Sequence, residues 1–213
     1  MKKKFLTFLL TIATMLACIF GFSACTALTP KMKEELSGFD YTFASGSCVI
    51  TGVKDNTVTE IVIPDFVTGI GDEAFDGCRD LMTIVIPDSV TSIGNYAFDG
   101  CDSLTSVDIP DNVTSIGNYA FRNCSSLTSV DIPDNVTSIG DGAFRHCDSL
   151  TSVVIGDSVT SIGDEAFFGC RGLMTIVIPD SVKSIGNDAF YYCNKLVEVV
   201  NHSTHITVTK GDS

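Results

Sequence analysis

The sequence predicts an α+β repeat solenoid of 23-residue units, with short strands on one face and turns and short helical segments on the other. Three observations lead to this fold class. Apolar columns recur every 23 residues over most of the 213-residue chain. Inside each unit, apolar and polar residues alternate as in a strand, and a Pro-Asp pair usually follows. Each unit holds only about eight apolar positions, too few to enclose a core, so neighbouring units must stack.

The composition agrees with one folded domain and narrows the class of partner. Hydrophobic residues make up 45% of the chain and charged residues 18%, which excludes a disordered polymer. The chain has 13 Lys and Arg against 26 Asp and Glu, a formal net charge of −13, and no stretch beyond the N-terminus gathers basic residues. We therefore expect no nucleic-acid partner, and contact with a membrane only through a lipid or N-terminal anchor.

The first element in chain order is a signal peptide over residues 1–24. Lysines at positions 2–4 precede an apolar run over residues 5–22, and a Ser-Ala pair then leads to Cys25. Small residues before a cysteine resemble a bacterial lipobox, which implies lipidation of Cys25 and an extracytoplasmic, lipid-anchored place on the bacterial cell surface. Cleavage by an ordinary signal peptidase and retention as a membrane anchor remain alternatives. Residues 25–38 are expected to form a tether.

The repeats occupy residues 58–201, and their unit reads C-x-x-L-x-x-[IV]-x-I-P-D-x-V-x-x-I-G-x-x-A-F-x-x. The cysteine column consists of Cys78, Cys101, Cys124, Cys147, Cys170 and Cys193. The leucine column consists of Leu81, Leu104, Leu127, Leu150, Leu173 and Leu196, and the phenylalanine column of Phe75, Phe98, Phe121, Phe144, Phe167 and Phe190. Because each unit contacts only its neighbours, the stability of the array should add along one axis.

Each unit divides into a strand half and a turn half. The segment L-x-x-[IV]-x-I alternates and is rich in β-branched residues, and Pro-Asp ends it. In the turn half, five glycines are expected where a tight turn needs a positive φ: Gly94, Gly117, Gly140, Gly163 and Gly186. The Ala-Phe pair that follows is expected on a short helical or 3₁₀ turn. Strands should therefore line one face and irregular turns the other.

This unit resembles the leucine-rich repeats of the BspA-like surface proteins, also described as the Treponema pallidum type. The resemblance covers residues 39–201 and rests on six consecutive copies of the I-P-D and I-G-x-x-A-F elements, with Gly156 once in place of proline. It implies a right-handed leucine-rich-repeat superhelix, an N-terminal β-hairpin cap over residues 39–57, and an exported binding or adhesion module. For the short C-terminal tail, residues 202–213, we expect either a last strand over 206–209 or a truncated relative.

The cysteine column is expected to form a buried structural ladder. In leucine-rich repeats this slot faces inward, where a small residue packs and satisfies backbone groups of the turn. Disulfides between rungs are disfavoured because the Cβ vectors run parallel, although a Cα separation of about 5 Å would allow them. The column has no C-x-x-C spacing that would bring two thiols onto one metal centre.

An aspartate follows the strand in every repeat, and two interpretations stay open. Stacked about 5 Å apart, neighbouring carboxylates repel by roughly 0.8 kcal/mol in bulk water. Each side chain could remain solvated and accept local backbone N–H bonds in an Asx-type turn. Alternatively, Asp88, Asp111 and Asp134 could bind a divalent cation weakly.

The outward positions of the strands form the candidate binding face. An acidic, hydroxyl-rich centre is flanked by apolar positions, a pattern that suits a flat protein contact. An ordinary strand surface with valines kept for strand propensity is the alternative. The candidate residues are Val62, Val85, Ser106, Asp108, Ser129, Asp131, Val154 and Val177.

The sequence offers no catalytic set. Its three histidines do not repeat, and its many serines belong to the repeat itself, so no nucleophile, base and acid stand out. Neither a phosphate loop nor a dinucleotide fingerprint is present, and we expect no cofactor. The function predicted is an exported binding module for a protein or cell-surface ligand, and the alternative is a structural or spacer lipoprotein of the envelope.

Overall fold

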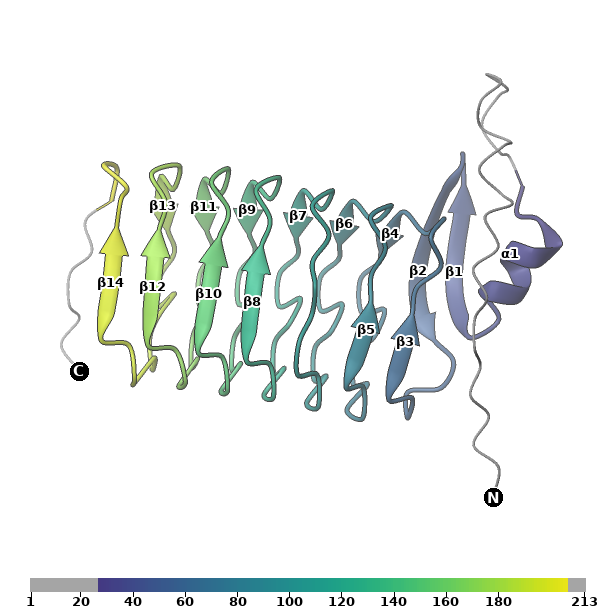
Figure 1. Cartoon of the computed structure of the whole chain (residues 1–213), viewed down its shortest axis with the longest axis horizontal. Coiled ribbons are helices and arrows are strands. Elements are labelled where there is room, and N and C mark those ends of the chain that lie inside the picture. The colour runs from purple at the N-terminus through teal and green to yellow at the C-terminus, as the bar shows by residue number, and fades with distance from the viewer. Residues whose placement is uncertain (1–26, 207–213) are drawn as a thin grey trace.

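A computed structural model describes residues 27–206, which form a solenoid whose turns follow one another along the long axis (Figure 1). The helix is α1 (Pro30–Glu35), and the strands are β1 (Phe39–Ala44), β2 (Ser47–Val53), β3 (Glu60–Val62), β4 (Gly69–Ile70), β5 (Thr83–Val85), β6 (Ser92–Ile93), β7 (Ser115–Ile116), β8 (Ser129–Ile132), β9 (Ser138–Ile139), β10 (Ser152–Ile155), β11 (Ser161–Ile162), β12 (Thr175–Ile178), β13 (Ser184–Ile185) and β14 (Glu198–Asn201). Strands therefore recur with the 23-residue period of the sequence.

A hairpin and a short helix occupy the N-terminal end of the solenoid. β1 and β2 pair antiparallel, and Ser45 and Gly46 between them both have positive φ, as a two-residue hairpin turn requires. β2 then pairs parallel with β4, so the hairpin continues the sheet of the repeats. α1 lies at the N-terminal end of the described chain (Figure 1), and the fully buried Leu36 that follows it joins the hydrophobic core. Part of the expected tether is thus a folded element.

The solenoid has strands on two opposite faces, one eight-stranded sheet on one face and three two-stranded sheets on the other (Figure 1). The two-residue strands β4, β6, β7, β9, β11 and β13 join β1 and β2 in one eight-stranded sheet. The longer strands pair in parallel as β3 with β5, β8 with β10, and β12 with β14. Equivalent residues of successive repeats lie opposite each other, for example Ile93 and Ile116. The side on which the sequence predicts irregular turns thus carries a sheet of its own.

The predicted helical segments of the repeats are not confirmed. Within residues 27–206 the only helix is α1, and the Ala-Phe segments are turns. The physical reason is the direction of their amides: Phe75 N donates to Ala97 O at 2.8 Å, and Phe98 N donates to Ala120 O at 2.7 Å. These bonds tie one repeat to the next, so the amides cannot also form an intra-helical ladder.

The prediction that five repeat glycines need positive φ is wrong. Gly94, Gly117, Gly140, Gly163 and Gly186 are not among the described glycines with positive φ. They are required because adjacent turns approach closely: a Cβ on Gly117 would lie 2.5 Å from the carbonyl carbon of Gly94. The left-handed position falls two residues later, at φ 53–58°, and is occupied by Glu73, Tyr96, Tyr119, Gly142, Glu165 and Asp188.

The segment 105–109 departs from the predicted strand pattern. No strand forms there between β5 and β8. In the 23-residue register Asp108 would lie opposite Asp131, and like charges directly opposite each other weaken strand pairing.

The core lies between the two sheets and consists of the repeated columns. The rings of the phenylalanine column stack with centroids 5.0–5.4 Å apart and planes within 13° of parallel. Five leucines of their column, Leu81, Leu104, Leu127, Leu150 and Leu173, are fully buried. Because every repeat adds the same interdigitating layer, the turns hold their register and present a regular outer surface.

Candidate functional site

The candidate site is the surface formed by β3, β5, segment 105–109, β8, β10, β12 and β14, which we name the long-strand face. Its valines are exposed by 69% at Val62, 57% at Val85, 59% at Val154 and 47% at Val177. Val62 pairs with Val85, and Val177 pairs with Val200 of β14. Alternation along each strand places the isoleucine or valine on either side in the core, so these valines face solvent because of strand geometry.

The centre of the long-strand face is acidic and rich in hydroxyl groups. Ser106, Asp108, Ser129 and Asp131 are all exposed there. All eight residues proposed from the sequence for the binding face therefore lie on one surface. A shallow hollow of about 350 Å³ lies at this centre, and we name it the acidic hollow. Its lining includes carboxylates of three neighbouring repeats: Asp108, Asp111, Asp131, Asp134 and Asp157.

The candidate cation ligands are not assembled into a coordination site. Among the described residues, no group of three or more His, Cys, Asp or Glu side chains is arranged to hold a metal ion, so Asp88, Asp111 and Asp134 do not form such a set. The turns that follow the strands are closed by backbone bonds such as Val113 N to Pro110 O at 3.0 Å. Asp134 accepts a bond from the backbone of the next repeat and not from its own turn: Asp157 N donates to Asp134 Oδ1 at 2.9 Å.

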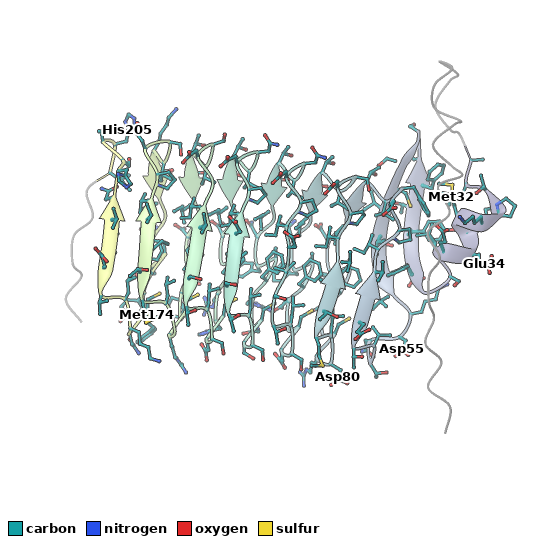
Figure 2. All side chains as sticks on the ribbon, viewed as in Figure 1. Met32, Glu34, Asp55, Asp80, Met174 and His205 are labelled. Carbon is teal, nitrogen blue, oxygen red and sulfur yellow. The ribbon has the colours of Figure 1, made fainter. Side chains whose placement is uncertain are left out.

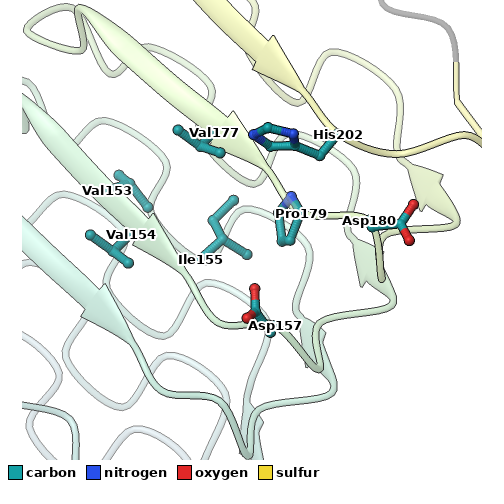
Figure 3. Close-up of a pocket in the computed structure, with 8 residues that line it drawn as sticks. All are labelled: Val153, Val154, Ile155, Asp157, Val177, Pro179, Asp180 and His202. Atoms are coloured by element: carbon teal, nitrogen blue, oxygen red, sulfur yellow. The ribbon is translucent and has the colours of Figure 1, made fainter.

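A second, larger hollow of about 590 Å³, which we name the apolar hollow, lies between β10 and β12 (Figure 3). Its walls are apolar and its rim is polar. The lining residues are Val153, Val154, Ile155, Asp157, Val177, Pro179, Asp180 and His202. It shares Val154, Ile155 and Asp157 with the acidic hollow, so the two are continuous along the long-strand face.

The cysteine column lies in the core as free thiols, and Cys48 of the hairpin is also free and buried. Each thiol from Cys101 to Cys193 donates to the carbonyl oxygen of a phenylalanine 26 residues earlier, at 3.1–3.3 Å. Burial raises the pKa of Cys193 to about 11, and burial with the nearby Asp76 raises the pKa of Cys78 to about 11. Burial raises the pKa of the four thiols between them as well. Such thiols stay protonated at neutral pH and are poor nucleophiles and poor metal ligands.

A ladder of side-chain amides and carboxylates, which sequence reasoning missed, runs along the turns. The residue after each repeat glycine accepts the backbone N–H of its counterpart one repeat later. The acceptors are Oδ1 atoms of Asp72, Asn95, Asn118, Asp141 and Asp164, at 2.6–2.9 Å. The signal was present as a column that holds only Asp or Asn. The hydrogen-bond partner of each residue in this column lies 23 residues away, so local sequence patterns do not indicate the contact.

Aromatic side chains on the turns mostly contact one another. Tyr96 and Tyr119 stack at 5.0 Å, and the Arg122 guanidinium lies 5.2 Å from the first ring and 5.4 Å from the second. Arg122 also pairs with the buried Asp99. A Cβ on Gly142 would lie 2.3 Å from the Tyr119 ring, so that ring is covered on its other side. These contacts favour a packing role for both rings over stacking on a sugar.

A second aromatic group, at Phe168, Tyr191 and Tyr192, lies nearer the C-terminal end of the repeats. The Tyr191 and Tyr192 rings are 4.3 Å apart and about half exposed. The His146 ring meets Phe168 edge-on at 5.5 Å, and burial together with Arg145 lowers the His146 pKa. His202 lies apart from this group, in the wall of the apolar hollow.

The labelled side chains Asp80 and Met174 mark one long edge of the solenoid and His205 the other (Figure 2).

Several predictions for the two ends of the chain fall on residues outside the described structure. Cys25 and the signal peptide lie outside residues 27–206, as do residues 207–209 of the possible last strand. Ile206 packs against the core but belongs to no strand. In the described part, no helix has the length and apolar character needed to cross a membrane.

Comparison with solved structures finds the same architecture in bacterial proteins. A leucine-rich cell surface protein of Faecalibacterium prausnitzii is 34% identical over 79% of this chain and 54% of its own, with a TM-score of 0.61. A leucine-rich repeat protein of Bacteroides ovatus is 32% identical over 76% of this chain and 51% of its own, with a TM-score of 0.69. The leucine-rich repeat protein of T. pallidum is 28% identical over 75% of this chain and 88% of its own, with a TM-score of 0.64.

This chain spans about half the length of the first two of these proteins. No match to a curated protein is found. The family described as the BspA type leucine rich repeat region, in six copies, matches residues 53–174 and 137–211. The matched segments cover the repeats and the columns that build the core, and the chain therefore belongs to the BspA-type leucine-rich repeat family.

Proposed function

We propose that this chain is an exported, lipid-anchored surface protein that binds another protein or a cell-surface ligand through the long-strand face. The observation that carries the proposal is the combination of four exposed valines with an acidic, hydroxyl-rich centre on one regular surface. A surface that offers exposed apolar side chains beside polar and charged ones can make both kinds of contact found in protein interfaces. A small-molecule site, in contrast, would be a deep and mostly enclosed cavity.

Three further observations support the proposal. Leucine-rich repeats of the BspA type are typically non-enzymatic binding scaffolds, and this chain carries them over most of its length. The F. prausnitzii relative is a cell surface protein. The lysines and apolar run that precede Cys25 have the order of an export signal.

Binding through the long-strand face is tested with the double variant Val85→Lys and Val177→Lys. Wild-type and variant proteins are applied to immobilised purified extracellular matrix proteins and to whole bacterial cells. The double variant should lose binding at least tenfold, because each lysine replaces an apolar contact with a hydrated charge. The matched control is Ser92→Lys with Ser184→Lys, which adds the same charge to exposed positions of β6 and β13 on the opposite face.

The outcomes separate the two functions named from the sequence. Selective loss in the long-strand variant supports a binding module, and equal loss in both variants places the contact elsewhere. If the wild-type protein binds no surface reproducibly, the chain acts as a structural or spacer lipoprotein.

Anchoring is tested separately by metabolic labelling with a palmitate analogue. The wild-type chain should incorporate the label, and Cys25→Ser should not. An unlabelled wild-type protein whose mass shows cleavage near Ala24 or Ala27 would instead indicate an ordinary signal peptidase.

A further inference from the structure

The repeat that contains β10 departs from the others in sequence and in packing. Gly156 stands where the other five repeats carry proline: Pro64, Pro87, Pro110, Pro133 and Pro179. A Cβ on Gly156 would lie 2.5 Å from the carbonyl oxygen of Pro133. The loop after β10 is therefore drawn against the loop after β8 more closely than a residue with a side chain would permit.

Strand pairing is interrupted on the other side of this repeat. All four residues of β10 pair with β8, and all four of β12 pair with β14, but β10 and β12 belong to separate sheets. The apolar hollow opens between these two strands (Figure 3). The hollow is open to solvent on its outer side, and its volume of about 590 Å³ leaves room for a large side chain of a partner. Gly156 itself lines the acidic hollow, and its neighbours Ile155 and Asp157 line both hollows, so this departure from the repeat lies where the two hollows of the proposed binding face meet.

Charge on the rim restricts what the hollow can accept. Asp157 and Asp180 stand at its edge, and its lining contains no lysine or arginine. Within residues 27–206, neither of these two aspartates forms an ion pair. The same holds for the four other aspartates of the acidic hollow: Asp108, Asp111, Asp131 and Asp134. A row of unpaired carboxylates about 4.8 Å apart from repeat to repeat is self-repelling, so a cationic ligand relieves repulsion as well as gaining attraction.

We propose that the hollow and the neighbouring aspartates bind an extended basic segment of a partner protein, with one arginine or lysine side chain seated in the hollow. The aliphatic stem of that side chain packs against Val154 and Val177, and its charged end meets Asp157 or Asp180. Alternate side chains of an extended segment are about 6.7 Å apart, so three of them span about 13 Å. Carboxylates on three neighbouring repeats span roughly 10 Å, and long, flexible side chains such as lysine can bridge the difference of about 3 Å. The inference rests on the proposed function of the long-strand face.

The experiment measures binding of a fluorescein-labelled heptapeptide of alternating valine and arginine to the full chain in non-ionic detergent. The matched probe replaces every arginine with glutamate. Gly156→Pro restores the residue that the other five repeats carry, which should press the β10 loop toward β12 and reduce the hollow without altering charge. Asp157→Asn removes one carboxylate at the rim. Asp65→Asn is its control, because it removes the same charge from the same repeat position at the far end of the array.

The arginine peptide should bind and the glutamate peptide should not. Gly156→Pro should weaken binding about tenfold, and Asp157→Asn about fivefold, the effect of losing roughly 1 kcal/mol. Asp65→Asn should leave it unchanged. Should Gly156→Pro unfold by circular dichroism, Val177→Thr replaces it, with Val197→Thr as its control at an exposed position outside the long strands. Only Val177→Thr should weaken binding. Equal losses in the two aspartate variants, or unchanged binding in Gly156→Pro, would overturn the proposal. If the peptide fails to bind while the Val85→Lys and Val177→Lys double variant still loses its surface partner, the basic-segment proposal fails and the proposed function stands.

Discussion

The thiol of Cys147 donates a hydrogen bond to the carbonyl oxygen of Phe121, 3.2 Å away and 26 residues earlier in the chain. Both residues are fully buried. The same relationship joins Cys101 to Phe75, Cys124 to Phe98, Cys170 to Phe144 and Cys193 to Phe167. Each cysteine therefore ties the turn of one repeat to the phenylalanine layer of the repeat before it.

Cys147→Ala should destabilise the protein by about 1–3 kcal/mol, because it opens a small void in the core and removes the second of two hydrogen bonds to the Phe121 carbonyl, which then keeps only the bond from Cys124 N. Urea unfolding followed by circular dichroism measures the loss. Ser152→Ala, an exposed change in the adjacent strand, is the control. A Cys147→Ala variant as stable as the control would show that the thiol bond contributes nothing.

Stability should fall as the pH rises above about 9. Burial raises the pKa of Cys78 and Cys193 from 9.0 to about 11, so over this window the unfolded thiols lose protons that the folded thiols keep. Their contribution is complete below pH 9 and is lost as the pH rises toward the folded pKa; each thiol removes at most about 1.4 kcal/mol per pH unit. Unfolding free energies at pH 7.5, 9 and 10, with a reductant present, test this. Cys78→Ala should have a shallower slope, and an identical slope would rule out the thiols as its cause.

The side-chain ladder along the turns should contribute measurable stability. Asn118 accepts the N–H of Asp141 at 2.9 Å, while its own N–H donates to Asn95 Oδ1 at 2.8 Å. Asn118→Ala removes one acceptor and should cost about 1 kcal/mol, the scale of a lost helix cap. Asn118→Asp keeps the acceptor and should cost less, since Asp occupies this position in the next two repeats. Thermal melts of the two variants give the comparison, and equal melting temperatures would contradict the role assigned to the ladder.

Two glycines offer a matched test of close approach against backbone conformation. A Cβ on Gly117 would lie 2.5–2.7 Å from three backbone atoms of the preceding repeat, so Gly117→Ala must force two turns apart. We expect it to cost on the order of 3 kcal/mol. Gly77 has a φ of 70° with open space around its Cβ position, so Gly77→Ala should cost only about 1 kcal/mol from the left-handed conformation. Chemical denaturation ranks the two variants; the reverse order would mean that the turns can separate freely.

Much of the fold could be predicted because the information is periodic. The 23-residue columns at Leu81, Cys78 and Phe75 and their successors specify which residues face inward, and the structure buries them. The alternation in each unit also places Val62 and Val177 outward, because side chains of a strand point to opposite faces in turn. Neither inference depends on contacts between distant residues.

The errors within the repeats all concern contacts between one repeat and the next. Local sequence patterns predict a positive φ at Gly94 and its successors, but the structure shows that the preceding turn leaves no space for a side chain. The Ala-Phe segments suit a short helix locally, yet their amides bond to the neighbouring repeat. Segment 105–109 reads as a strand, and the opposition of Asp108 and Asp131 weakens its pairing.

By itself, the sequence determined the period, the buried columns and the outward face of this protein, because those follow from spacing along one chain. Only the tertiary structure decided what happens between turns: the second sheet, the thiol and amide ladders, and the hollow beside Gly156. Their physical reason is the stacking distance of neighbouring turns. At that distance a missing Cβ, a side-chain acceptor or a pair of like charges determines which backbone groups meet, and residues 23 positions apart become immediate neighbours.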